Sequence, residues 1–153
     1  MDDLADLYRE IIVEHGRSPR NHGRLDGDDV VAREGYNPLC GDRITLFVER
    51  LGDRLGRVAF VGEGCAISTA SASLLTEAVA GRTVDEAEAL FQAFRRALTT
   101  ADEDDAMAAA AELGELAALL GVRAYPMRVK CATLAWHTLH EALDAPDESP
   151  PAE

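Results

Sequence analysis

The spacing of apolar residues divides this chain into a helical start, a central stretch of strands and a helical second half. Between residues 3 and 15 apolar side chains recur at helical spacing, which predicts an amphipathic helix that ends at Gly16. Residues 16–29 are rich in glycine, proline and asparagine, and this composition predicts a loop.

Three strands are predicted in the central stretch. Apolar and polar residues alternate over residues 44–48 and, less cleanly, over residues 55–61. The pair Gly52 and Asp53 lies between these two segments and predicts the turn of a hairpin. Residues 30–32 predict one further, short strand.

The second half of the chain predicts only helices. Thr83 and Glu86 have the spacing of a capping box, which marks the start of one of them. The predicted spans are 66–80, 84–98, 106–120 and 127–143. Strands followed by helices indicate an α+β fold, with a small antiparallel three-stranded sheet covered on one side by helices.

Length and composition indicate a single domain. The chain has 153 residues, of which 47% are hydrophobic. We expect this domain to cover residues 1–144, followed by an acidic, proline-containing tail without fixed structure at 145–153. No apolar run approaches the ~20 residues that span a bilayer. The start lacks the basic and apolar regions of a secretory signal, so the expected compartment is the cytoplasm.

The charge balance argues against two classes of partner. The formal net charge of -13 repels phosphate backbones and anionic lipids, so we expect neither nucleic acid nor a membrane as a partner. Basic residues nevertheless lie beside the cysteines in the sequence, at Arg43, Arg128 and Lys130.

Three cysteines are the main candidates for chemistry, namely Cys40, Cys65 and Cys131. An odd number of cysteines in a reducing compartment favours metal binding or thiol chemistry over a disulfide framework. Antiparallel pairing brings the start of one hairpin strand beside the end of the other. We therefore expect Cys40 to approach Cys65.

Asp42 is a fourth candidate ligand, because in an extended stretch it points to the same side as Cys40. Cys131 is expected about one turn into the last helix, where unpaired backbone N–H groups favour a thiolate. Three thiolates and one carboxylate suit a tetrahedral Zn²⁺ site, or an iron–sulfur site, better than magnesium or calcium. From spacing alone, three unconnected cysteines are an equal alternative.

The histidines are rival candidates for metal ligands. On a helix, His137 and His140 lie on different faces from Cys131. The sequence leaves His15 and His22 open as ligands.

Three segments together resemble a known family. They are residues 37–42 (Asn-Pro-Leu-Cys-Gly-Asp), 62–68 (Gly-Glu-Gly-Cys-Ala-Ile-Ser) and 129–131 (Val-Lys-Cys). The chain resembles the IscU/NifU-type iron–sulfur cluster assembly family, and most of all its SufU branch, from Leu4 to about Leu143. The resemblance implies that Cys40, Asp42, Cys65 and Cys131 bind zinc.

The resemblance also implies a function. A SufU-type protein is a zinc-dependent sulfurtransferase of the SUF system that works with a SufS-like, pyridoxal-phosphate cysteine desulfurase. By position, Cys40 would receive the persulfide sulfur and pass it to a SufBCD-like scaffold for iron–sulfur cluster assembly. Arg128 is our candidate for stabilising the released Cys40 thiolate, with a solvated charge at the helix start as the equal alternative.

Two departures favour sulfur transfer over the alternative, an iron–sulfur scaffold of the IscU type. Lys130 stands where IscU-like scaffolds carry a histidine, and a protonated lysine has no lone pair for iron. The stretch between the second and third cysteines is also longer than in the scaffolds, with the excess in the 99–120 region. A structural zinc module and a cysteine hydrolase rank lower, the latter because the sequence shows no persuasive Cys/His pairing.

Overall fold

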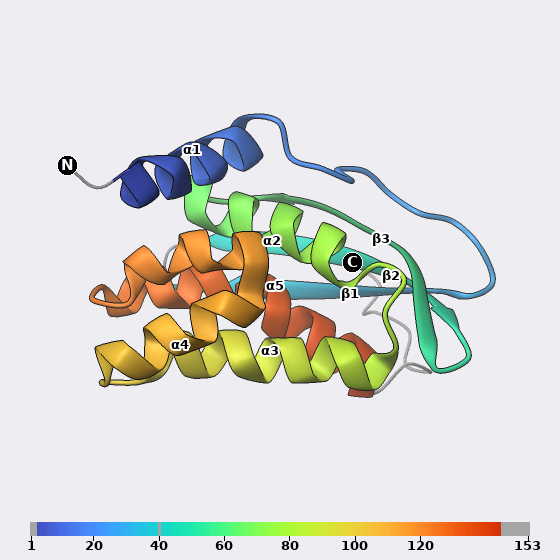
Figure 1. The fold of residues 1–153 in the computed structure, drawn as a ribbon. Helices are drawn as coiled ribbons and strands as arrows, with labels where there is room; N and C mark the ends of the chain where they lie inside the picture. Colours follow the sequence, from blue (N-terminus) through green and yellow to red (C-terminus); the bar gives the residue numbers. More distant parts are fainter. Residues whose placement is uncertain (1–2, 40, 145–153) are drawn as a thin grey trace.

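The computed structural model describes residues 3–39 and 41–144, so Cys40 and the predicted tail at 145–153 lie outside the described residues. Figure 1 shows the arrangement of the elements. In chain order they are α1 (Asp3–Arg17), β1 (Val30–Asn37), β2 (Asp42–Leu51), β3 (Arg54–Glu63), α2 (Ala66–Val79), α3 (Val84–Thr99), α4 (Glu103–Leu113), the 3₁₀ helix η1 (Gly114–Val122) and α5 (Pro126–Asp144).

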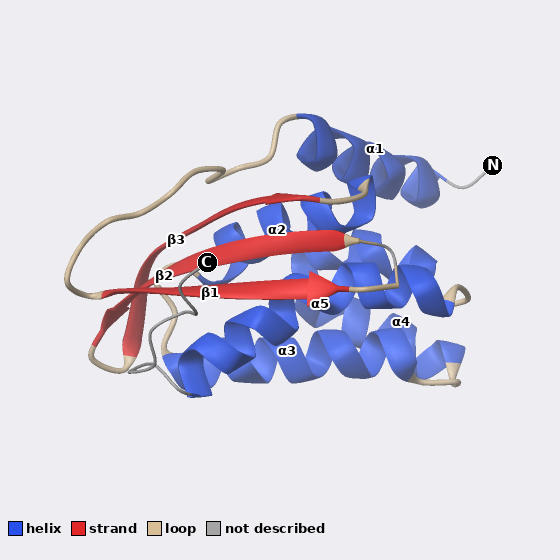
Figure 2. Ribbon diagram, turned by 180° about the vertical axis from the view of Figure 1, so that it is seen from behind, coloured by secondary structure: helices blue, strands red, loops and turns tan. Residues whose placement is uncertain are grey.

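The predicted fold class is confirmed. The three strands form one antiparallel sheet in the order β1-β2-β3. Helix α2 packs against β3, and α5 packs against β1 and β2. Figure 2 shows the sheet in front and the helices behind it, so the helices cover one face. The turn at Gly52 is confirmed, with Leu51 paired to Arg54 across it.

Two strand predictions are wrong in extent. β1 is 8 residues long rather than a short strand at 30–32, because polar residues such as Arg33 and Glu34 continue it where the apolar pattern stops. β2 begins at Asp42, which pairs with Asn37 of β1. The segment before Asp42 is a turn in which the Gly41 N–H donates to the Asn37 carbonyl at 2.8 Å. Gly41 has a φ of 78°, so the expected extended stretch is not found.

The helices agree better with the sequence, with one exception. The Thr83 capping box is present at the start of α3. α1 continues through Gly16 to Arg17. The predicted helix over 106–120 is confirmed for residues 106–113 and wrong in its bounds. Asp102 caps an earlier start, and the chain leaves the α-helical conformation at Gly114, where φ is 58°. The remainder of that segment forms η1.

The hydrophobic core lies between the helices and the covered face of the sheet. Trp136 of α5 is fully buried, and its ring centroid lies 6.0 Å from that of Phe91 and 5.3 Å from that of Phe94 on α3. Leu46 of β2 and Leu75 of α2 are also fully buried. This core fixes α5 against the sheet and so sets the position of the residues that α5 contributes to the site.

The loop between α1 and β1 runs beside the outer edge of β3. The Gly23 N–H donates to the Phe60 carbonyl at 2.8 Å, and the Phe60 N–H donates to the Asn21 carbonyl at 3.1 Å. The His22 ring lies edge-on to the Phe60 ring. Among the described helices, none has the length and apolar character that crossing a membrane requires.

Candidate metal centre

Three side chains from three different elements meet at one point. Asp42 is the first residue of β2, Cys65 directly precedes α2, and Cys131 lies in α5. Their ligand atoms all lie within 4.8 Å of one another. Asp42 and Cys131 are buried, whereas Cys65 is exposed. The structure thus brings together three of the four predicted zinc ligands, and Cys40, the fourth, lies outside the described residues.

The pairing of β2 with β3 places Asp42 beside the start of α2. Arg43 pairs with Glu63, so the chain that leaves β3 passes directly over the Asp42 carboxylate. The Cys65 N–H donates to Asp42 Oδ1 at 2.9 Å. A side chain at Gly64 would lie 2.9 Å from the same oxygen and would collide with Ser68 Oγ. A larger residue there would displace the Ser68 hydroxyl and the Asp42 carboxylate.

Cys65 also forms the N-terminal cap of α2. Its Sγ accepts a hydrogen bond from the Ser68 N–H at 3.4 Å. Negative charge is stabilised at a helix N-terminus, and this sulfur occupies that place. The prediction that the same effect acts on Cys131 is wrong, because Cys131 is the sixth residue of α5 and lies beyond its first turn. No residue type marked this cap in the sequence, because the group that donates to Cys65 Sγ is the backbone N–H of Ser68.

Zinc fits the geometry of these donors. With Zn–S near 2.3 Å and Zn–O near 2.1 Å, a tetrahedral site separates sulfur from oxygen by about 3.5 Å. The structure places Cys65 Sγ 3.7 Å from Asp42 Oδ2. Two sulfur donors and one carboxylate form a soft set that suits zinc better than magnesium or calcium. They would leave one of the four tetrahedral positions to a further ligand.

The basic residues near the cysteines in sequence contact aromatic rings. The guanidinium of Arg43 lies 4.9 Å from the Tyr36 ring centroid, and that of Arg128 lies 5.2 Å from the Tyr125 ring centroid. Such contacts hold a cation over the ring face. The proposed role of Arg128 at a released thiolate stays a prediction. Lys130, the residue before Cys131, is exposed.

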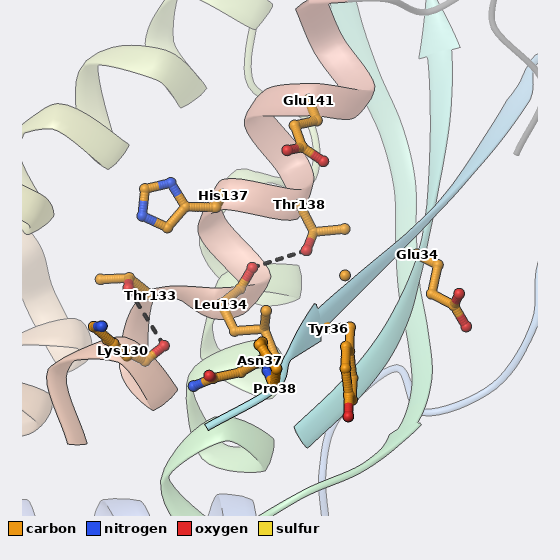
Figure 3. Close-up of a pocket in the computed structure, with 11 residues that line it drawn as sticks. Glu34, Tyr36, Asn37, Pro38, Lys130, Thr133, Leu134, His137, Thr138 and Glu141 are labelled. Atoms are coloured by element: carbon orange, nitrogen blue, oxygen red, sulfur yellow. Dashed lines mark hydrogen bonds between the residues drawn. The ribbon is translucent and has the colours of Figure 1, made fainter. Parts of the chain in front are cut away.

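A hollow of about 340 Å³ opens between β1 and α5 beside this site (Figure 3). Asn37 and Pro38, on the segment that leads to Cys40, line one side, and Lys130 and Thr133 of α5 line the other. Asn37 is buried, and its Oδ1 accepts from the Leu39 N–H at 3.1 Å. Its Nδ2 has no hydrogen-bond partner among the residues that the structure describes. The hollow therefore adjoins the segments that carry the first and third cysteines.

The four histidines contact other groups. His137 lies edge-on to the Phe91 ring, His140 bonds to Glu88 at 2.6 Å, and His22 contacts Phe60. Burial lowers the pKa of His15 and of His137 below 6.5. His15 belongs to a different group of side chains, described below. Among the described residues, the set at Asp42 therefore contains no histidine.

The fold and the site define a class of protein. The sequence model of the NifU-like N terminal domain matches residues 7–144, and the chain belongs to this family. The resemblance noted in the sequence is thereby confirmed.

Individual relatives cover nearly the whole chain. The zinc-dependent sulfurtransferase SufU of Bacillus subtilis is 40% identical over 141 residues, which are 92% of this chain and 92% of that protein. The iron–sulfur cluster assembly scaffold protein IscU of Streptococcus pyogenes is 42% identical over 143 residues, 94% of this chain and 86% of that protein.

A solved structure shows the same fold. It is a putative iron–sulfur cluster assembly scaffold protein for the SUF system from Fervidobacterium islandicum. Its TM-score is 0.76 at 34% identity, and the match covers 88% of this chain and 94% of that one. The chain therefore shares its family and its fold with these proteins. One of them is named a sulfurtransferase, and the other two are named scaffold proteins.

Proposed function

We propose that this chain is a zinc-dependent sulfur acceptor of iron–sulfur cluster assembly, which takes sulfur from a cysteine desulfurase onto Cys40. The observation that carries the proposal is the meeting of Asp42, Cys65 and Cys131 within 4.8 Å. Two sulfurs and a carboxylate suit zinc, and a relative with 40% identity is named a zinc-dependent sulfurtransferase.

Asp42, Cys65, Cys131 and Cys40 would hold the zinc, which keeps its cysteine ligands deprotonated at neutral pH when it is bound. Cys65 is already positioned for this by its cap on α2 and by its N–H bond to Asp42. The buried Asp42 and Cys131 form the fixed part of the set.

The transfer step would be a displacement at sulfur. The Cys40 thiolate attacks the outer sulfur of the desulfurase persulfide, and a new S–S bond forms on Cys40. The original S–S bond breaks, and the desulfurase cysteine leaves as a thiolate. No external oxidant or reductant is consumed. A second displacement passes the sulfur onward.

The partners follow from this chemistry. The donor would be a SufS-like, pyridoxal-phosphate cysteine desulfurase, and the recipient a SufBCD-like scaffold. The hollow between β1 and α5 supports access by a partner, because Asn37 and Pro38 line it just before Cys40. A segment of the desulfurase that lies there would be next to the acceptor.

Scaffolding is the second candidate, and the name of the Streptococcus pyogenes relative favours it. Lys130 counts against it, because a protonated amine cannot ligate iron from the position before Cys131. After anaerobic incubation with iron and sulfide, a stable visible chromophore on this protein would support the scaffold. We expect none.

The deciding experiment is Cys40→Ser in a desulfurase assay. We expect turnover of cysteine to fall to the rate of the desulfurase alone, and radiolabelled sulfur to be absent from the variant. Leu39→Ala is the matched control, because Leu39 directly precedes Cys40 in the sequence, is exposed and carries no reactive group. Circular dichroism shows whether both variants fold. Normal stimulation and labelling by folded Cys40→Ser protein would exclude Cys40 as the acceptor.

A further inference from the structure

A second group of possible ligands lies at the other end of α2. It consists of His15 on α1, Glu77 on α2 and Glu115 on η1, and we call it the His15 cluster. Their ligand atoms lie within 4.8 Å of one another. Cys65 and Glu77 are separated by roughly 18 Å along the helix. The cluster is therefore distinct from the thiol site.

His15 is held in one orientation. Its side chain is 3% exposed, and Nδ1 lies 2.6 Å from Ser73 Oγ. Ser73 Oγ also accepts from the Arg20 N–H at 2.7 Å, which fixes the serine. A hydrogen bond at one ring nitrogen is the usual means by which proteins orient the other nitrogen toward a metal.

The other ring nitrogen faces two carboxylates without bonding to either. His15 Nε2 lies 3.8 Å from Glu115 Oε1 and 4.0 Å from Glu77 Oε1. Both distances exceed a hydrogen bond, and no other hydrogen bond to Nε2 is recorded within residues 3–39 and 41–144. The buried imidazole thus presents Nε2 to two carboxylates at distances longer than a hydrogen bond.

The spacing suits a metal ion after a small movement. Two donors at about 2.1 Å from a tetrahedral ion lie about 3.4 Å apart. The Glu77 and Glu115 side chains are 46% and 61% exposed, so each can rotate to bring its oxygen the roughly half an ångström closer to His15 Nε2 that this spacing requires. The ring of His15 need not move.

The surroundings leave room for water ligands. A hollow of about 230 Å³ lies between α2 and η1 on the carboxylate side of the cluster, with Glu77 and Glu115, but not His15, in its wall. Arg82 also lines this hollow, and its Nε donates to the Ala78 carbonyl at 2.6 Å. The nearby Arg20 is paired with Glu14 at 3.1 Å. These arginines therefore leave the carboxylates of Glu77 and Glu115 to balance the charge of a bound divalent cation.

We propose that His15, Glu77 and Glu115 form a second site, which binds a first-row divalent cation such as Co²⁺, Mn²⁺ or Zn²⁺ through one nitrogen and two carboxylate oxygens. One imidazole with carboxylates suits these ions better than calcium or magnesium, and the absence of sulfur distinguishes the site from the one at Cys65. The ligands come from three separate segments, so the ion would fasten α1 to α2 and η1.

The test adds Co²⁺ to protein already loaded with one zinc. Zinc binds more tightly than cobalt, so it keeps the thiol site. We expect one further equivalent of Co²⁺ to bind and to give visible d–d absorption without a thiolate-to-cobalt charge-transfer band. Failure to bind a second equivalent would overturn the proposal, whatever the outcome of the desulfurase assay.

Two exposed glutamates supply the variant and its control. Glu115→Gln removes a proposed ligand, and Glu112→Gln makes the same charge change outside the cluster. We expect Glu115→Gln to lower the affinity of the second site for Co²⁺ by at least about tenfold. Even the loss of a residue that only orients a metal ligand typically lowers metal affinity by about tenfold or more. Glu112→Gln should leave it unchanged. Equal effects of the two variants would indicate diffuse attraction to the acidic surface and overturn the site.

A measurement on wild-type protein avoids any effect of substitution on folding. A second equivalent of Zn²⁺ should shift the nitrogen resonance of His15 Nε2 strongly and leave that of His140 in place. His140 is a suitable internal reference because it already bonds to Glu88. An unmoved His15 resonance at saturating zinc would overturn the proposal.

Discussion

At the scale of single residues, Cys65 combines two roles at one sulfur atom. The Sγ caps α2 through the Ser68 N–H and is also a donor of the candidate metal set. Its backbone N–H in turn fixes the Asp42 carboxylate. The start of one helix therefore organises two of the three described donors, and Gly64 is the residue whose small size permits it.

Glu49 provides a prediction about pH at the same scale. The side chain of Arg57 and then its backbone N–H donate to the Glu49 carboxylate, and they lower its pKa from 4.5 to about 2. Because the pKa is lower in the folded chain, the pair stabilises the fold above pH 4.5, and this contribution is lost as the pH falls through about 2. A carboxyl NMR titration measures it. Arg57→Gln should return the pKa toward 4.5, and an unchanged value would contradict the assignment.

At the scale of elements, the contact of β1 with α5 depends on Gly35. A Cβ at this position would overlap Thr138 Oγ1 and would lie 3.3 Å from Thr138 Cβ. Gly35→Ala should therefore destabilise the protein by about 1–3 kcal/mol, measured by denaturant unfolding.

Thr138→Ala, alone and combined with Gly35→Ala, tests whether this overlap is the cause. Thr138→Ala removes the overlapping oxygen, whose hydrogen bond to the Leu134 carbonyl lies within α5. The double variant should recover part of the stability lost in Gly35→Ala. Strictly additive effects of the two substitutions would show that the overlap is not the cause.

Local signals predicted most helix and strand positions. The Thr83 capping box and the Gly52 turn are short-range features, and both were found. The predicted helix over 106–120 was placed too far along the chain because its alanine-rich pattern continues past Gly114, where the backbone leaves the α-helical conformation. The length of β1 was missed because pairing with β2, rather than an apolar pattern, extends it.

The part of the candidate site that depends on local structure was also predictable from the sequence. Strand pairing, a local effect, accounts for the approach of Asp42 to Cys65. The position of Cys131 depends on how α5 packs on the sheet, so the sequence indicated it only through the family resemblance. The His15 cluster depends on how α1 and η1 lie on α2, and no sequence pattern indicates that arrangement.

At the scale of the whole molecule, the proposed zinc would join parts of the chain that are far apart in sequence. Its described donors come from β2, the start of α2, and α5. Removing zinc with a chelator should lower the melting temperature by roughly 10 °C, as expected for a ligand present far above its dissociation constant. Calorimetry before and after zinc is restored measures this shift.

Cys131→Ser supplies the comparison for the chelator experiment. This variant lacks a buried donor, so its lower melting temperature should not fall further when the chelator is added. If wild-type protein that is shown to contain zinc melts at the same temperature after zinc is removed, the ion does not hold these elements together.

The loop that follows α1 has a consequence for the behaviour of the protein at high concentration. Hydrogen bonds through Gly23 and Asn21 occupy backbone groups of Phe60 that β3 would otherwise present to another chain. Exposed strand edges are the usual starting points of intermolecular sheet growth. Here the loop between α1 and β1 covers the β3 edge at Phe60. A strand that extends this sheet is therefore blocked at Phe60 on the β3 edge, which favours addition alongside β1, the other outer strand.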